Sequence, residues 1–215
     1  MNTQPSSSYV RYRAGKGGIG ELVLGGASYG SRGRGARMTY TTAMSQFGPI
    51  MTAATEHGVC WLGIHASVAR LEAELRGDYP AAELRSDDGA MGDLATRLMA
   101  WIGGDTKELF LPLDIRATPY QRAVWGELCA IPLGATRSYG EIARRLGRSS
   151  AARAVGHANG SNPVAIVIPC HRAIGSNGTL TGYRWGLEYK RRLLEHERAV
   201  AQVSRQLTLA GPRFT

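Results

Sequence analysis

Cys170 and His171 are adjacent, and together they are the candidates for covalent chemistry in this chain. Pro169 precedes them and ends the apolar run 164–168; because proline lacks a backbone donor and restrains the chain, it can present Cys170 at the end of a buried segment. A thiolate is a strong nucleophile, but it forms near neutral pH only where a base or a positive field lowers the pKa of the thiol. His171 could be that base, directly or through water, and a carboxylate on the last helix could orient its ring. A cysteine at the end of an apolar run is more often an inert core residue, so the surrounding sequence must distinguish the two interpretations.

The other two cysteines, Cys60 and Cys129, do not extend this chemistry. An odd number of cysteines without a CxxC pair argues against a disulfide framework and against a cysteine-rich zinc module. Cys60 lies in a strand-like run and Cys129 in an apolar helical pattern, so we expect both to be buried. The sequence therefore indicates a reactive thiol and no metal site.

Length and composition restrict the class of protein. The chain has 215 residues, of which 43% are hydrophobic and 20% charged, which suits one compact domain or two small ones and excludes wholesale disorder. Its longest apolar runs are far shorter than the ~20 residues that a membrane-spanning helix needs. The chain opens with Ser, Gly and Arg rather than with an apolar secretory segment. We therefore expect a cytoplasmic protein without a membrane partner.

The first half of the sequence predicts a small α/β unit behind a flexible leader. Residues 1–37 are rich in Gly, Ser and Arg, which disfavours ordering, so we expect them to be largely flexible. Runs of β-forming residues and apolar residues with helical spacing follow. Strands are expected at 38–43, 49–55 and 59–65, helices at 68–75 and 91–102, and an extended connector at 111–115, in a unit that covers residues 38–116.

The second half carries the start signals of several short helices. Serine and threonine caps, one followed by proline and one completing a capping box, mark three of them. These helices are expected to begin at Thr118 with Pro119, at Ser138 with Glu141, and at Ser149 or Ser150, the third covering 151–159. The second and third have helix-turn-helix proportions. The unit is expected to cover 117–203, with a buried extended run at 164–168, a final helix at 187–203 and a tail at 204–215.

The net charge of +9 is unevenly distributed along the chain. Residues 1–50 carry +5 (six basic, one acidic), residues 51–136 carry −5 (seven and twelve), and residues 137–215 carry +9 (thirteen and four). Clustered Arg and Lys attract phosphate and gain from counterion release, so the last third suggests a polyanion partner. A solvated basic face would give the same composition.

A series of motifs occupies the last hundred residues at specific spacings. They are Arg153-Ala154-Val155-Gly156, Asn162-Pro163, Ile168-Pro169-Cys170-His171-Arg172, Gly182-Tyr183-Arg184-Trp185-Gly186-Leu187, and Lys190 with Leu193-Leu194-Glu195-His196-Glu197. Together they resemble the methylated-DNA–protein-cysteine methyltransferases, most of all the methyltransferase domains of bacterial adaptive-response proteins. The similarity extends from about Met38 to Arg198.

The resemblance implies an activity and the residues that perform it. The family transfers an alkyl group from O6 of guanine, or less readily from O4 of thymine, in double-stranded DNA to its own cysteine, once per molecule and without a cofactor. By this resemblance Cys170 is the acceptor, and His171 and Glu197 match the base and its orienting acid. Asn162 matches the asparagine that braces the active-site segment. Tyr139 matches the tyrosine that crowds the phosphate, assists rotation of the nucleotide and protonates the purine.

The resemblance also implies contacts with DNA and a fold. Arg153 matches the arginine that fills the gap in the base stack when the target nucleotide rotates out. Tyr183 is expected to line the alkyl pocket, and Ser176 and Arg148 to contact substrate or DNA. The expected fold is α+β, with a ribonuclease H-like amino-terminal subdomain that holds a small sheet. A mostly helical subdomain of the winged helix-turn-helix type follows, whose second helix enters the minor groove, and we expect a monomer.

One alternative belongs to another functional class. A regulatory or lesion-binding module could recognise alkylated bases without removing them, and such proteins carry another residue, commonly tryptophan, at the position of Cys170. The cysteine favours the methyltransferase. The sequence departs from the family pattern at Gly140, where relatives often have glutamine, so one DNA contact is not expected. It also lacks the amino-terminal cysteine cluster that binds zinc in complete adaptive-response proteins, so phosphotriester repair is not expected.

Overall fold

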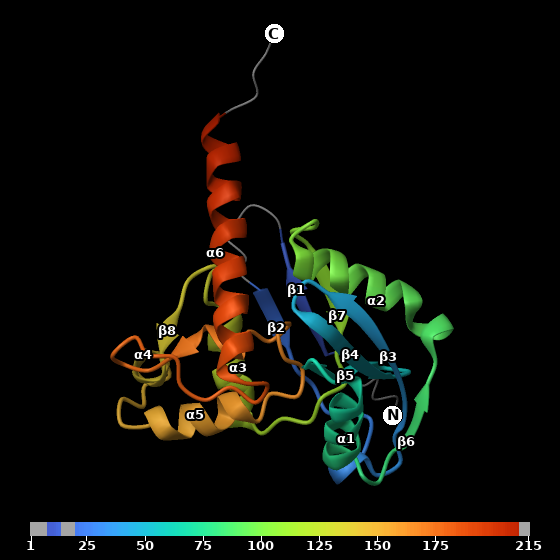
Figure 1. The fold of residues 1–215 in the computed structure, drawn as a ribbon. Coiled ribbons are helices and arrows are strands. Elements are labelled where there is room, and N and C mark those ends of the chain that lie inside the picture. Colours follow the sequence, from blue (N-terminus) through green and yellow to red (C-terminus); the bar gives the residue numbers. More distant parts are fainter. Residues whose placement is uncertain (1–7, 14–19, 211–215) are drawn as a thin grey trace, which may run out of the picture.

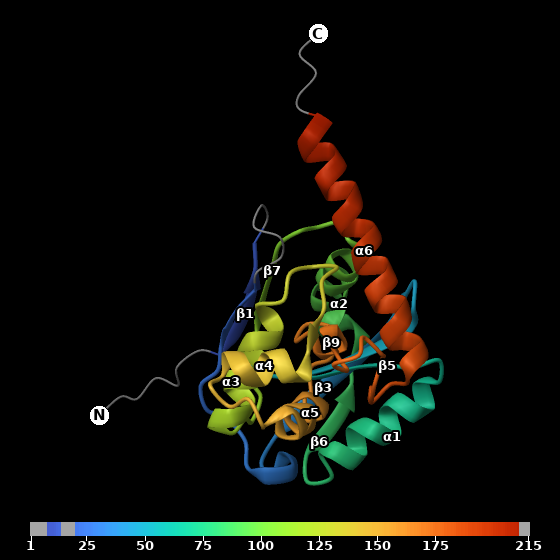
Figure 2. The same cartoon turned by 90° about the vertical axis from the view of Figure 1, so that its left-hand side faces the viewer.

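The computed structural model describes residues 8–13 and 20–210, which form a mixed α/β structure with three small sheets and six α-helices (Figures 1 and 2). The strands are β1 (Tyr9–Tyr12), β2 (Gly20–Val23), β3 (Arg37–Ser45), β4 (Gly48–Thr55), β5 (Gly58–Ile64), β6 (Glu83–Ser86), β7 (Leu109–Pro112), β8 (Arg137–Ser138) and β9 (Ala173–Ile174). The α-helices are α1 (Val68–Asp78), α2 (Asp88–Gly103), α3 (Pro119–Cys129), α4 (Tyr139–Arg145), α5 (Ala152–Gly160) and α6 (Leu187–Ala210). Short 3-10 turns lie at Ser31–Gly33 and Cys170–Arg172.

The largest sheet has the strand order β5-β4-β3-β6. β3, β4 and β5 pair antiparallel in sequence order, and β6 joins β3 in parallel, so the three predicted strands are confirmed. The two predicted helices are also confirmed, and both lie against this sheet. Each buries the apolar stripe that predicted it, Leu71 and Leu75 in α1 and Leu98 and Ile102 in α2.

The amino-terminal segment is ordered where it is described, so the prediction of a flexible leader is wrong for residues 8–13 and 20–37. β1 pairs antiparallel with β2 on one side and with β7 on the other. Val10 and Tyr12 point into the core, with 0% and 3% exposure, and alternate with partly exposed neighbours. The composition of the leader did not predict that it is ordered, because β7, the strand that pairs with β1, lies about a hundred residues away in the sequence. Residues 1–7 and 14–19 lie outside the described residues.

A buried carboxylate holds the stretch between β2 and β3. Asp114 is 2% exposed, and its Oδ1 accepts a hydrogen bond from the backbone N–H of Ser28 at 2.8 Å. Its Oδ2 accepts from the hydroxyl of Thr55 at 2.6 Å, and its backbone carbonyl accepts from the hydroxyl of Tyr29 at 2.9 Å. The carboxylate thus ties the amino-terminal residues to β4, and the Gly-rich stretch has defined partners for its polar groups.

Two of the three predicted helix caps in the second half are confirmed. Thr118 with Gln121 and Ser138 with Glu141 both form complete capping boxes, at the starts of α3 and α4. The third prediction is wrong, because α5 begins after Ala151 and no side chain caps it. A backbone turn, in which Ala151 N–H donates to Arg148 O at 2.9 Å, takes the place of a serine cap.

Residues 164–168 are fully or almost fully buried as predicted, but they are not extended. The chain turns there: Val167 N–H donates to Ala165 O at 2.7 Å and Ile168 N–H to Val164 O at 3.0 Å. Ile166 has a φ of 68°, in the left-handed region that a β-branched residue adopts only under constraint. An apolar run cannot distinguish a strand from a buried turn, because both bury every side chain.

The final helix is longer than predicted. α6 ends at Ala210, so residues 204–210 continue the helix instead of forming a tail; residues 211–215 lie outside the described part of the chain. Figures 1 and 2 both show its last turns extending beyond the rest of the molecule. Among the described residues, no helix combines the length and the apolar character needed to cross a membrane.

Gly63 in β5 gives a test of this packing. A Cβ atom there would lie 2.5 Å from the rings of both Trp61 and Trp185, so we expect Gly63→Ala to lower the free energy of unfolding by about 1–3 kcal/mol. Gly92 in α2 is the matched control, because a Cβ there meets nothing within 4 Å and alanine favours the helix by about 0.5–1 kcal/mol. Urea denaturation of both variants measures the difference. Equal effects of the two substitutions would contradict the close approach of the tryptophans.

Candidate active site

Cys170 opens the 3-10 turn that follows the buried turn 164–168, and it lines a cavity of about 420 Å³. The residue is 6% exposed. The cavity lining comes from the start of α4, from α5, from residues 162–172, here called the active-site segment, and from the loop before α6. The lining residues are Tyr139, Gly156, Asn159, Gly160, Asn162, Cys170, Thr181, Gly182, Tyr183, Arg184 and Trp185. Its size falls in the usual range of small-ligand sites, about 300–1,000 Å³.

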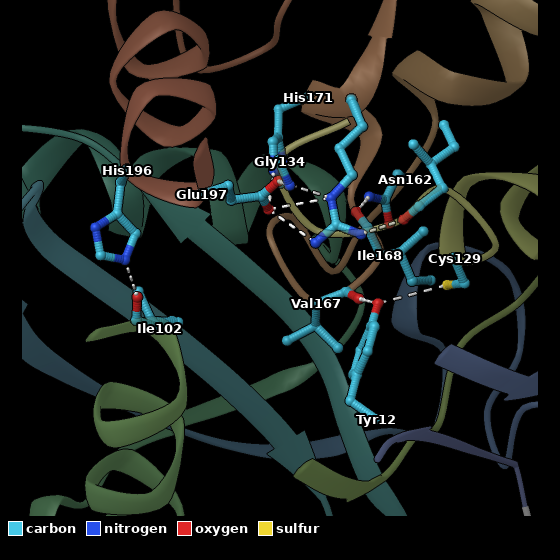
Figure 3. Close-up of polar contacts among 12 residues, drawn as sticks. Tyr12, Ile102, Cys129, Gly134, Asn162, Val167, Ile168, His171, His196 and Glu197 are labelled. Atoms are coloured by element: carbon cyan, nitrogen blue, oxygen red, sulfur yellow. Dashed lines mark hydrogen bonds and ion pairs between the residues drawn. The ribbon is translucent and has the colours of Figure 1, made fainter. Parts of the chain in front are cut away.

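Asn162 braces the segment that presents Cys170. Its side-chain Nδ2 donates to Ile168 O at 2.7 Å (Figure 3), and its Oδ1 accepts from Val164 N–H at 3.0 Å. Cys170 N–H in turn donates to Ile168 O at 2.8 Å. One buried amide therefore links both ends of the turn, and this geometry supports the bracing role that the sequence predicted.

The side chain of His171, next to Cys170 in the chain, forms a buried hydrogen bond with the side chain of Glu197. His171 is 0% exposed, and its Nε2 lies 2.8 Å from Oε1 of Glu197 on α6 (Figure 3). The guanidinium of Arg172 binds the same carboxylate through Nε, at 2.9 Å from Oε2, and through Nη2, at 2.8 Å from Oε1. Gly134 N–H also donates to Oε2 at 3.3 Å. The structure thus brings together the predicted base and its predicted acid, and adds an arginine that the prediction did not include.

This arrangement determines which ring nitrogen can accept a proton. Burial opposes ionisation of Glu197, but the hydrogen bonds from His171 and Arg172 and the positive charge of Arg172 outweigh it and lower its pKa to about 2. Burial lowers the pKa of His171, and the charges of Arg172 and Lys190 lower it further, whereas Glu197 raises it. The net shift is downward, so the ring is neutral near pH 7. A neutral ring donates its Nε2–H to the carboxylate, which leaves Nδ1 as the acceptor. Nδ1 is buried and has no hydrogen-bond partner among the described residues, so it is free to act as a base.

The pKa of the Cys170 thiol is not lowered in the structure, although the sequence analysis expected a nucleophilic cysteine to have a lowered pKa. Burial raises the pKa of Cys170, although the hydrogen bond with Asn162 and the charge of Lys190 act in the opposite direction. Lys190 is 0% exposed and donates from Nζ to Ala173 O at 2.7 Å and to Thr181 O at 2.8 Å. Its pKa is lowered by burial to about 8, so it is mostly charged at pH 7 and stabilises a thiolate once one forms. A base is therefore required to deprotonate the thiol. The sequence analysis gave Lys190 no role, although Lys190 lies in one of the motifs.

Both predicted tyrosines line the cavity. Tyr139 begins α4 and lies with its ring 5.9 Å from Nζ of Lys190; burial raises the pKa of its hydroxyl. Tyr183 has a buried hydroxyl without a partner in the described part of the chain, and burial raises its pKa well above the usual value. Both hydroxyls stay protonated at neutral pH and are available as hydrogen-bond donors.

The predicted DNA-contacting residues lie outside the cavity lining. Arg153 on α5, Arg148 in the turn before it and Ser176 in the loop after β9 are all exposed. Arg148 lies with its guanidinium carbon 5.5 Å from the centre of the Tyr120 ring. Arg145, another basic residue of this region, is bound to Glu127 of α3. Exposure leaves the first three residues accessible to a macromolecule.

The sequence analysis gave no role to seven of the cavity residues: Gly156, Asn159, Gly160, Thr181, Gly182, Arg184 and Trp185. Arg184 forms ion pairs at 2.8 Å with both Glu74 and Asp78 of α1. Trp185 packs edge-on against Trp61 of β5, with ring centres 5.4 Å apart. The loop before α6 is therefore attached to the amino-terminal half, a contact for which the sequence has no local signal.

Comparisons with known proteins agree with a DNA-repair site of this kind. Residues 119–199 match the family model described as the DNA-binding domain of 6-O-methylguanine DNA methyltransferase. The chain is 43% identical over 164 residues to the methylated-DNA–protein-cysteine methyltransferase of Mycobacterium tuberculosis, covering 75% of this chain and 93% of that protein. It is 37% identical over 194 residues to the regulatory protein Ada of Salmonella typhimurium, covering 89% of this chain and 53% of that one.

A solved structure agrees as well. The crystal structure of Mycobacterium tuberculosis OGT in complex with DNA has a TM-score of 0.62 to this chain and 41% identity, covering 75% of this chain and 94% of that one. Fold, cavity and buried cysteine thus define a protein of the DNA alkyl-acceptor class. The chain belongs to the family of methylated-DNA–protein-cysteine methyltransferases.

The role of Glu197 can be tested by Glu197→Gln. A glutamine amide can donate to Nε2 of His171 and thereby move the ring proton to Nδ1, so we expect methyl transfer to slow by about 10²–10⁴-fold. The variant also leaves the buried Arg172 without a carboxylate, which should lower the free energy of unfolding by about 3–5 kcal/mol. Single-turnover transfer from an oligonucleotide containing O6-methylguanine measures the first effect, and urea denaturation the second.

Glu195→Gln is the matched control, because Glu195 lies two residues earlier on α6 and is exposed. It should change neither the rate nor the stability. A Glu197→Gln protein that transfers methyl groups at the wild-type rate would show that the carboxylate does not set the tautomer of His171.

Proposed function

We propose that this protein repairs DNA by direct damage reversal, in which Cys170 accepts the alkyl group of O6-methylguanine, and less readily that of O4-methylthymine. The observation that carries the proposal is a cysteine in the wall of a nucleobase-sized cavity, followed by a buried histidine whose Nε2 is held by a carboxylate and whose Nδ1 is free. Family membership supports the same activity. Each molecule acts once, because the thioether formed is stable, and the reaction needs no cofactor.

The reaction balances with the groups at hand. Nδ1 of His171 takes the proton of the Cys170 thiol through an intervening water molecule, because no hydrogen bond joins the two groups directly. The thiolate attacks the methyl carbon, so that an S–C bond forms as the bond from that carbon to O6 breaks. The electron pair of the broken bond goes to the guanine ring, which takes a proton from the hydroxyl of Tyr139, a residue of the cavity lining. The phenolate left on Tyr139 then regains a proton from His171 through solvent, which returns both side chains to their starting states. The net result moves one methyl group from the base to sulfur and one proton from sulfur to the base. Lys190 stabilises the transient thiolate.

DNA is the partner that fits this chemistry. A base inside a duplex cannot reach a cysteine that is 6% exposed, so the target nucleotide must rotate out of the stack. We propose that Arg153 fills the gap it leaves, that Arg148 and Ser176 contact the backbone or the substrate, and that Tyr183 lines the alkyl pocket. The solved complex of the Mycobacterium tuberculosis relative with DNA supports a DNA partner.

The finer features of the fold follow the same proposal. We infer that the amino-terminal unit, 38–116, is ribonuclease H-like, and that the unit 117–203 is of the winged helix-turn-helix type. In that unit α4 and α5 form the helix pair, and α5 enters the minor groove. We further propose that the protein acts as a monomer in the cytoplasm.

The alternative, a module that binds alkylated bases without removing them, is not favoured. Such a protein needs a cavity but no base next to a thiol. Cys170 together with the buried pair His171 and Glu197 is a set that binding alone does not require.

Intact-protein mass spectrometry tests the acceptor. After exposure to an oligonucleotide containing O6-methylguanine, we expect one added methyl group per molecule, located at Cys170 by peptide analysis, and none in Cys170→Ala. Cys129→Ala is the matched control, because Cys129 is a buried cysteine whose pKa is raised to about 11 by burial, and it should still take up one methyl group at position 170. Methylation of Cys170→Ala at one equivalent would overturn the assignment.

Arg153→Ala tests the rotation of the nucleotide. Because Arg153 is exposed and outside the cavity, we expect the variant to repair duplex DNA about tenfold more slowly, an effect of roughly 1.4 kcal/mol, while it reacts normally with the free base O6-methylguanine. Single-turnover rates with the two substrates measure this difference. Equal loss with both substrates would contradict the role of Arg153 in DNA.

A further inference from the structure

The amino-terminal strand β1 reaches the active-site segment through one side chain, Tyr12. The strand lies between β2 and β7, and its alternation turns Tyr12 inward at 3% exposure. Tyr12 pairs in register with Gly20 of β2, where a Cβ atom would lie 2.7 Å from the tyrosine ring. On another side the ring packs on Trp101, with ring centres 4.9 Å apart. The ring is therefore held in one place, and Gly20 supplies the space for it.

The hydroxyl of Tyr12 donates to the backbone carbonyl of Val167 at 2.6 Å and also contacts Sγ of Cys129 at 3.7 Å (Figure 3). Both partners are buried. No other donor bonds this carbonyl within residues 8–13 and 20–210. Burial raises the pKa of Tyr12 well above the usual value, so the hydroxyl remains a donor at neutral pH.

Val167 lies in the turn that presents Cys170, three residues before it. The turn contains the left-handed Ile166, which is a strained conformation that persists only when surrounding contacts hold it. Asn162 holds the turn from within the same segment, and β5 holds it through Leu62, whose carbonyl accepts from Ala165 N–H at 3.1 Å. The hydrogen bond from Tyr12 adds a contact from the opposite end of the sequence.

We propose that Tyr12 is a positioning residue for methyl transfer: its hydroxyl fixes the carbonyl of Val167 and thereby sets the place of Cys170 in the cavity. The proposal rests on the proposed function. If Tyr12 has this role, the amino-terminal strand β1 contributes to the active site. Displacing a reacting atom by about 1 Å can slow a reaction by about 10²-fold, so the loss of one such contact should be measurable in the rate.

The test compares Tyr12→Phe with Tyr9→Phe. Tyr9 lies on the same strand but faces outward, and its ring packs against Phe110, so removal of its hydroxyl is the matched control. With duplex oligonucleotide containing O6-methylguanine, we expect the single-turnover rate constant of Tyr12→Phe to fall about tenfold and that of Tyr9→Phe to stay within twofold. The affinity for the same DNA, measured in a Cys170→Ser background, should not change.

A second readout separates positioning from simple stability. The pH dependence of the reaction of Cys170 with iodoacetamide reports the pKa of the thiol, which burial raises. A loosened turn admits water, so the pKa in Tyr12→Phe should fall towards its ordinary value even as methyl transfer slows. The titratable groups that interact electrostatically with this thiol are unchanged in both variants: Lys190, Tyr139, Tyr183 and Cys129.

The outcomes are distinguishable. If the wild-type protein takes up no methyl group at Cys170, the proposed function fails. If it does and folded Tyr12→Phe reacts at the wild-type rate with an unchanged thiol pKa, Tyr12 has no positioning role. Should Tyr12→Phe not fold, Gly20→Ala keeps the hydroxyl group but shifts the ring, and with it the hydroxyl, away from Val167. A smaller fall, about threefold, is then expected, and an unchanged rate would overturn the proposal.

Discussion

The buried carboxylate of Glu197 is the group on which the rest of the site depends. It accepts hydrogen bonds from His171, from two nitrogens of Arg172 and from the backbone of Gly134. Arg172 in turn donates to Ile131 O at 2.6 Å. A buried charge is tolerated only when it is paired and its lone pairs are filled, and here the set is close to complete. The same atoms join α6, the active-site turn and the end of α3, so the pair that sets the tautomer of His171 also holds three elements together.

Burial has two opposite effects on reactivity at this site. It raises the pKa of the Cys170 thiol, which keeps the sulfur protonated and unreactive in the free protein, and it lowers the pKa of His171, which keeps the base ready. The thiolate then forms only when a proton is removed within the cavity, next to the charge of Lys190. For a protein that is consumed by one reaction, a thiol that stays neutral until a substrate occupies the cavity avoids loss to other electrophiles.

Local patterns in the sequence predicted the elements well where the cause is local. The predicted cap at Thr118 and the predicted capping box at Ser138 are confirmed because each is closed within four residues. Three strands of the largest sheet, β3, β4 and β5, were predicted by runs of β-forming residues, whereas β6 was not predicted. The helices α1 and α2 were predicted by apolar periodicity, which reflects one buried face. Predictions failed where distant partners decide: β1 is ordered by β7, and the run 164–168 turns because Asn162, Leu62 and Tyr12 bond its backbone.

The sequence by itself determined the chemistry: a cysteine beside a histidine, a glutamate on the last helix, and the motif spacing that resembles one repair family. Residue types carry this information because nucleophile, base and acid are properties of side chains. Only the tertiary structure decided that Nε2 of His171 binds Glu197 and leaves Nδ1 free, that Arg172 and Lys190 share the site, and that Tyr12 reaches Val167 from 155 residues away. Those features depend on burial and on which groups meet, and a one-dimensional pattern contains neither, because desolvation and hydrogen bonding arise only when distant segments pack together.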